Sequence, residues 1–171
     1  MPETKPMTAS AYVDLQVAED APADHPPPEL FLTWATPVAQ HHERPIEVSI
    51  RLVSRAESAA LNHQYRGKST PTNVLSFPFE APPGIDWNEP FVGDLAVCVD
   101  LMASEAAEQQ KPPHDHWAHI TIHGILHLLG YDHIDDSDAT IMEALECHLL
   151  AQLGIPDPYR TVLQENQTTH E

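Results

Sequence analysis

Three histidines near residue 130 have a spacing that suits a single metal ion. His123 and His127 lie four residues apart in a segment with helical periodicity, so both imidazoles project from one face about one turn apart. Gly130 has no Cβ and can adopt the left-handed conformation that ends a helix, which turns the chain back and brings His133 to the same point. Three neutral nitrogens without a fourth protein ligand are typical of a catalytic zinc site with water in the open position. The sequence therefore predicts one Zn²⁺ per chain, held by His123, His127 and His133.

His119 competes for this role because it lies on the same helical stripe, four residues before His123. The helical rise separates it from His127 by about 12 Å, too far for both side chains to bind one ion at about 2 Å. We therefore expect His119 to support the ligands or to pack in the core. We expect no metal role for His114 or His116.

The interval His-x3-His-x5-His is also that of the metzincin peptidases, which makes peptide hydrolysis the rival function. In those enzymes the residue after the first histidine is a glutamate that acts as general base. Here that position is Gly124, which cannot accept a proton, and the helix face beside the site carries no other acid. We expect Asp132 to fix the turn or orient an imidazole rather than to act as the base.

Length and composition indicate one catalytic domain. A chain of 171 residues, 42% of them hydrophobic, can bury one core, and we expect a single domain over 1–171 with mobile ends at 1–10 and about 157–171. The first residues lack the pattern of a secretory signal, and no segment has the roughly 20 apolar residues of a membrane span, so we expect a cytoplasmic protein without a membrane partner. Cys98 and Cys147 are expected to be buried, reduced thiols.

The charge is strongly acidic but uneven. Eight Lys and Arg against 26 Asp and Glu give a formal charge of −18, which disfavours sequence-blind binding to a long nucleic acid. Yet residues 44–68 hold five of the eight positive side chains. This segment is either a local basic surface or a set of ordinary solvated charges. The five residues are Arg44, Arg51, Arg55, Arg66 and Lys68.

Hydrophobic periodicity predicts an α/β or α+β fold, with a small mixed sheet packed with about five helices. Ser54 and Glu57 form the pattern of a capping box, Asp100 and Ser137 are expected to cap two further helices, and Pro37 is expected to kink or shorten the first. The expected strands are 11–18, 46–52, 73–77 and 94–99, and the expected helices begin near residue 28 and span about 54–65, 100–110, 114–129 and 138–153.

The run His123-Gly-Ile-Leu-His-Leu-Leu-Gly-Tyr-Asp-His133 matches the signature H-G-x-L-H-L-x-G-Y-D-H of the bacterial YbeY endoribonucleases, a family that the chain resembles. The resemblance extends to 61–68, to 71–78, to Gly93-Asp94-Leu95 and to 157–159, so it covers nearly the whole chain. No motif position departs from the family pattern.

The resemblance implies a zinc-dependent hydrolase that cleaves single-stranded RNA, matures the 3′ end of 16S rRNA and acts in ribosome quality control. The implied partners are single-stranded RNA and the ribosome or its proteins, and no DNA partner is expected. The family's metal ligands correspond to His123, His127 and His133, and its functional arginine corresponds to Arg66, a catalytic candidate. By its position alone, Arg66 also fits a cation that the dipole favours at a helix C-terminus. Lys68 is a candidate RNA contact.

In the implied reaction Zn²⁺ polarises a phosphate oxygen or lowers the pKa of a bound water, while Arg66 stabilises charge on the phosphate. Two other classes compete with the RNase: a metallopeptidase and a non-enzymatic ribosome-assembly factor with structural zinc. Gly124 speaks against the first, and the missing fourth ligand speaks against the second. The sequence does not choose between water and the ribose 2′-OH as nucleophile, or between zinc and another divalent metal.

Overall fold

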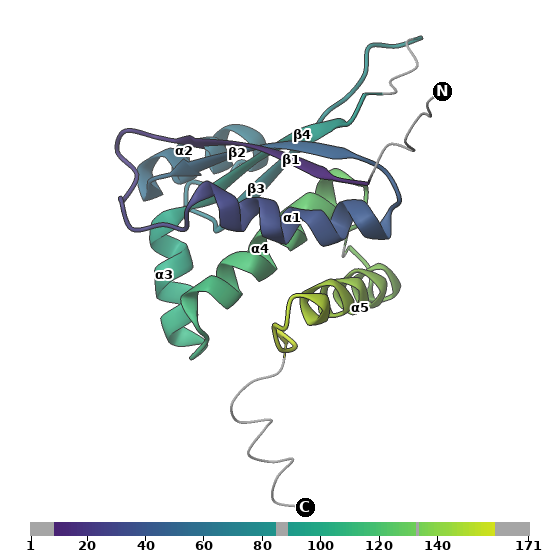
Figure 1. The fold of residues 1–171 in the computed structure, drawn as a ribbon. Helices are drawn as coiled ribbons and strands as arrows, with labels where there is room; N and C mark the ends of the chain where they lie inside the picture. The colour runs from purple at the N-terminus through teal and green to yellow at the C-terminus, as the bar shows by residue number, and fades with distance from the viewer. Residues whose placement is uncertain (1–8, 85–88, 133, 160–171) are drawn as a thin grey trace, which may run out of the picture.

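A mixed four-stranded sheet with helices on both faces forms the protein in the computed structural model, which describes residues 9–84, 89–132 and 134–159 (Figure 1). The strands follow the order β1-β2-β4-β3. The first three in this order are parallel, and β3 pairs antiparallel with β4 at the sheet edge. Their bounds are Ala11–Val17 for β1, Ile46–Val53 for β2, Val74–Pro78 for β3 and Phe91–Cys98 for β4.

The described residues form five helices besides the sheet, which confirms the predicted fold class. Helices α1 (Pro28–His41) and α4 (Pro113–Leu128) lie against one face, and α2 (Arg55–Arg66) lies against the other. Helices α3 (Val99–Glu108) and α5 (Asp136–Gln152) pack against α4. None of the helices within the described ranges is long and apolar enough to cross a membrane.

Alternation along β4 places apolar side chains on both faces of the sheet. Leu95 and Val97 on β4 belong to the large core beneath α1 and α4. Ala96 and Cys98, which alternate with them, belong to a smaller cluster on the α2 side. The sheet is therefore buried on both faces at β4, whereas the face of β1 that carries Tyr12, Asp14 and Gln16 is open to solvent.

Helix α4 is a core helix, and this sets the environment of the histidines on it. Apolar residues around most of its circumference are buried, so only a narrow strip reaches solvent. His123 and His127 on this strip are partly exposed. The buried apolar side chains of α4 are Trp117, Ala118, Ile120, Ile122, Ile125, Leu126 and Leu128.

Local signals set the ends of α2, the helix that carries Arg66. The Ser54 hydroxyl accepts a hydrogen bond from the Glu57 amide at 3.1 Å, so the predicted cap is confirmed. The Glu57 carboxylate does not complete the capping box, because it accepts two hydrogen bonds from Arg51 instead. Gly67, at φ 72°, ends the helix in the left-handed conformation.

The expected caps at Asp100 and Ser137 are wrong, and α1 is not shortened at Pro37. Helix α1 continues through the buried Pro37 to His41, because the packing of this segment in the core outweighs the lost backbone hydrogen bond. Helix α3 starts directly after β4 without a side-chain cap, and Asp100 lies in its first turn. Helix α5 is capped by Asp135, whose carboxylate accepts from the Asp138 amide at 2.8 Å, so Ser137 lies inside the helix. Strand β4 also begins at Phe91, three residues before the expected start.

Both cysteines are free thiols, as predicted. Cys98 is buried at the end of β4, but Cys147 is only partly buried. Burial and the hydrogen bond from Cys147 Sγ to Asp157 at 3.3 Å raise the pKa of this thiol to about 11. Neither cysteine is thus a nucleophile near neutral pH.

Candidate functional site

His123 and His127 lie side by side on α4, as their spacing predicts. Their Nε2 atoms are 3.1 Å apart, and the ring centroids are 4.6 Å apart. Two imidazole ligands of a tetrahedral zinc ion, each at about 2.0 Å, would have nitrogens about 3.3 Å apart. The two rings therefore fit one metal ion through Nε2.

The turn after α4 has the geometry that the sequence predicts for it. Gly130 adopts φ 102°, and the Tyr131 amide donates to the Leu126 carbonyl at 3.1 Å. Asp132 accepts a hydrogen bond from the Ile134 amide at 3.3 Å, so its carboxylate fixes the turn. His133 itself lies outside the described residues, and its role as third ligand stays a prediction.

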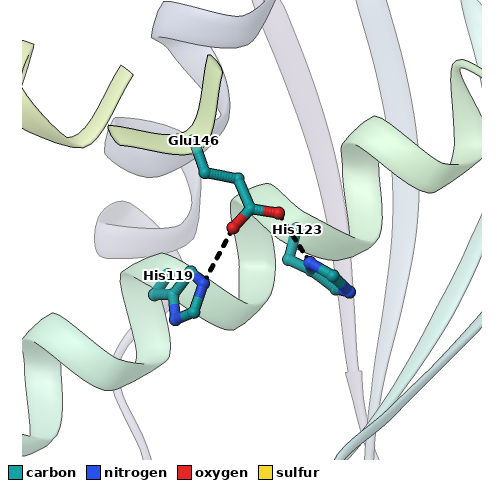
Figure 2. A group of neighbouring side chains, drawn as sticks. All are labelled: His119, His123 and Glu146. Atoms are coloured by element: carbon teal, nitrogen blue, oxygen red, sulfur yellow. Dashed lines mark hydrogen bonds and ion pairs between the residues drawn. The ribbon is translucent and has the colours of Figure 1, made fainter. Parts of the chain in front are cut away.

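A buried glutamate from α5 joins two histidines of α4 (Figure 2). One carboxylate oxygen of Glu146 lies 2.6 Å from His123 Nδ1, and the other lies 2.9 Å from His119 Nε2. Tyr159 donates its hydroxyl to Glu146 as well. Because the carboxylate accepts a hydrogen bond from His123 Nδ1–H, the lone pair of that ring lies on Nε2, the atom that faces His127.

The electrostatics of this group favour an ionised Glu146 carboxylate. Burial alone would raise the pKa of Glu146, but hydrogen bonds from His119 and His123 outweigh it and lower this pKa to about 2. Burial lowers the pKa of His119, against the effect of Glu146. Burial and the contact with Glu146 raise the pKa of Tyr159. Glu146 is thus a fixed acceptor at neutral pH.

His119, His123 and Glu146 could themselves hold a metal ion, since each offers a ligand atom within 4.8 Å of the others. An ion there would replace the hydrogen bonds of Glu146 with coordination bonds. His123 is common to both candidate arrangements. A single metal ion bound to His123 would therefore have either His127 or the pair of His119 and Glu146 as its other described ligands.

Glu146 is the functional candidate that the sequence analysis missed, because only acids on the histidine helix were considered. A signal was present: Met142, Glu146, Leu149 and Leu150 form the buried stripe of α5, and Glu146 is its acid. A fully buried carboxylate needs partners, so an acid in a core stripe indicates a buried polar site.

The other histidines of α4 lie apart from this group. His116, about two turns before His123, is buried and bonds through Nε2 to Glu105 at 2.8 Å. His114 is exposed at the start of the helix. This second imidazole–carboxylate pair resembles that of His123 and Glu146 but does not reach the groove.

A groove of about 880 Å³ opens beside the two histidines. Arg66 lines it from the last turn of α2, and the α4 histidines line it from the opposite side. Lys68 is exposed and is not among the lining residues. The groove residues are Leu61, Tyr65, Arg66, Thr72, Asn73, Val74, Leu75, Ser76, Phe77, Pro78, Asp94, His123 and His127.

The basic segment 44–68 divides into paired and exposed charges. Arg51 donates to the Glu57 carboxylate at 2.7 and 3.1 Å, so its charge is balanced locally. The four other cations of the segment are exposed. Of the five cations in this segment, Arg66 is the one that lines the groove.

Gly124 is explained by packing. A Cβ at this position would lie 2.9 Å from Leu95 Cδ2 and 3.3 Å from Val74 Cγ2, so α4 can approach the sheet only with glycine here. The Gly124 carbonyl also accepts a hydrogen bond from Ser76 at 3.2 Å. A side chain at this position would point at the sheet and not at the histidines, so it is poorly placed for a catalytic base.

A family model and a similar protein both match this chain under the same family name. The model of the family described as Endoribonuclease YbeY matches residues 29–154. A protein of Alkalilimnicola ehrlichii named Endoribonuclease YbeY is 53% identical over 137 residues, which cover 79% of this chain and 82% of that protein. The solution structure of TM1509 from Thermotoga maritima is similar with a TM-score of 0.54 and 25% identity, over 82% of this chain and 86% of that one.

Proposed function

The chain belongs to the endoribonuclease YbeY family, and on this basis we propose that it is a zinc-dependent, single-strand-specific endoribonuclease that matures the 3′ end of 16S rRNA. The observation that carries the proposal is the meeting of His123, His127 and Arg66 at one groove of about 880 Å³. The sequence signature of residues 123–133 supports the ribosomal role, with the ribosome or its proteins as partners in the cytoplasm.

The proposed metal site consists of His123, His127 and His133. The Nε2 atoms of the first two are 3.1 Å apart, close to the spacing in a tetrahedral site, and Glu146 directs the lone pair of His123 toward the ion. A zinc ion bound here would supply Lewis-acid polarisation of the scissile phosphate or activate a water. Coordination by His119, His123 and Glu146 is the weaker alternative because His119 and Glu146 do not line the groove that Arg66 lines.

Arg66 is proposed to bind the scissile phosphate across the groove from the histidines. A guanidinium presents two parallel N–H donors to phosphate oxygens and keeps its charge at every physiological pH. Charge that develops on the phosphate during cleavage would strengthen these hydrogen bonds. Lys68, two residues further along the chain, is proposed to contact the RNA backbone outside the groove.

The substrate class is tested by incubating purified protein with labelled single-stranded RNA, duplex RNA and casein, each with and without a chelator. We expect cleavage of single-stranded RNA alone, its loss with chelator and its return when Zn²⁺ is added. Metal-dependent cleavage of casein without cleavage of RNA would indicate a peptidase. Zinc binding without cleavage of either substrate would indicate an assembly factor.

The role of Glu146 predicts a loss of metal affinity on substitution. Glu146→Gln keeps the size of the side chain but offers one acceptor oxygen in place of two, so the orientation of the His123 ring is no longer enforced. Loss of such a carboxylate partner costs about tenfold to a hundredfold in metal affinity. The measurement is competition for Zn²⁺ against a chromophoric chelator at fixed pH.

The matched control for this prediction is Glu105→Gln. Glu105 of α3 bonds at 2.8 Å to His116, which lies on α4 like His123. His116 is not a proposed metal ligand. Its substitution should leave the zinc affinity within about twofold of wild type. Equal losses of affinity in both variants would mean that the effect comes from a general disturbance of α4, a possibility that melting of the metal-free proteins also checks.

A further inference from the structure

An exposed aromatic ring stands beside Arg66 at the groove. Tyr65 is 59% exposed although it belongs to the last turn of α2, and it lines the groove together with Phe77 of β3. The two rings meet edge to face, with centroids 4.6 Å apart and an interplanar angle of 62°. This contact holds the Tyr65 ring from one side while more than half of its surface stays open to solvent.

An aromatic side chain that is mostly exposed contributes little to the stability of the fold, so the place of Tyr65 at the groove calls for a functional explanation. Aromatic rings beside a cation are the common means by which proteins bind unpaired nucleotides: the base stacks on the ring, and the cation binds the phosphate. Here the two functions fall to neighbouring residues, since Arg66 follows Tyr65 directly and lines the same groove.

The charge of the protein gives stacking added weight. With a formal charge of −18, the protein as a whole repels a polyanion, and the groove itself contains the carboxylate of Asp94. Long-range attraction therefore contributes little to RNA binding. Affinity has to come from contacts inside the groove, and a stacked base is a contact that does not depend on net charge.

We propose that Tyr65, supported by Phe77, forms a base-stacking subsite that takes one unpaired base of the RNA next to the phosphate bound by Arg66. This inference rests on the proposed ribonuclease function and assigns the origin of its strand specificity. In a duplex both faces of a base are covered by its neighbours, so a paired base can reach Tyr65 only after the helix is locally opened, at a cost of a few kcal/mol. Single-stranded RNA offers the base without that cost.

The test measures the dissociation constant of the zinc-loaded protein for a short single-stranded RNA with a non-cleavable linkage, and KM and kcat with the cleavable RNA. Tyr65→Ala should weaken binding and raise KM about tenfold, the effect of one lost base stack, with kcat changed less. Tyr65→Phe should retain nearly full affinity, because stacking needs the ring and not the hydroxyl. Compared with intact RNA, an RNA with one abasic nucleotide at the subsite should bind the wild-type protein about tenfold less tightly. Tyr65→Ala should bind the intact and the abasic RNA with equal affinity.

Tyr12 provides the matched control. It is a tyrosine of similar exposure, 56%, on β1, at the sheet edge opposite to β3 and away from the groove. Tyr12→Ala should leave dissociation constant, KM and kcat at wild-type values, and melting temperatures of all variants should agree within a few degrees.

The outcomes separate this inference from the proposed function. Failure of the wild-type protein to bind or cleave any RNA would refute the ribonuclease function itself. If the wild type cleaves single-stranded RNA while Tyr65→Ala binds it equally well and still discriminates against duplex RNA, the stacking subsite is refuted and the ribonuclease function stands.

Discussion

Replacing His127 with alanine is expected to remove the metal from the protein and to reduce RNA cleavage by about a thousandfold or more, because metal catalysis contributes several kcal/mol to transition-state stabilisation. The His127 ring is partly exposed at the groove, so the fold should survive its loss. The measurements are metal content after dialysis, the single-turnover cleavage rate and the melting temperature of the metal-free protein.

His119→Gln is the control that decides between the two metal arrangements. His119 bonds to Glu146 at 2.9 Å but does not line the groove, so this variant should keep its zinc and most of its activity. The opposite pattern, with zinc lost from His119→Gln and kept by His127→Ala, would place the ion among His119, His123 and Glu146. The histidine pair at the groove would then not be the metal site.

Arg66→Ala is expected to slow RNA cleavage about a hundredfold, the cost of roughly 3 kcal/mol for one lost charge-assisted contact to a transition-state phosphate. Zinc content should not change, and stability should change by only about 0.5 kcal/mol, since Arg66 is exposed at the end of α2. Arg66→Lys should recover part of the rate, because an ammonium keeps the charge but loses the planar two-pronged donor.

Arg55→Ala is the matched control for Arg66. Arg55 is an exposed arginine at the opposite end of the same helix, and it does not line the groove. Its loss should leave the cleavage rate near the wild-type value. A similar decrease in both variants would show that net charge on this surface matters and not the position of Arg66, while wild-type cleavage by zinc-loaded Arg66→Ala would refute the role proposed for it.

Local sequence signals were sufficient for most of the secondary structure. The cap at Ser54 and the glycine turn at Gly130 were predicted correctly, because each depends on a few adjacent residues and on backbone sterics. Where prediction was wrong, a competing group stood nearby. Asp135 lies two residues before Ser137, and its carboxylate accepts the capping hydrogen bond in place of the Ser137 hydroxyl.

The sequence by itself determined that His123 and His127 lie on one helix face, since a separation of four residues fixes their relative direction in any α-helix. It could not determine what faces them. Glu146 is 23 residues from His123 and reaches it only because α5 packs against α4, and Arg66 and Phe77 come to the groove from α2 and β3. Periodicity indicates which side of a helix or strand is buried. Which other element packs against that side depends on how the apolar faces of all the elements are buried together. The histidine pair could therefore be predicted from the sequence. The buried carboxylate that orients the His123 ring and the groove that the two histidines line depend on how the helices pack together.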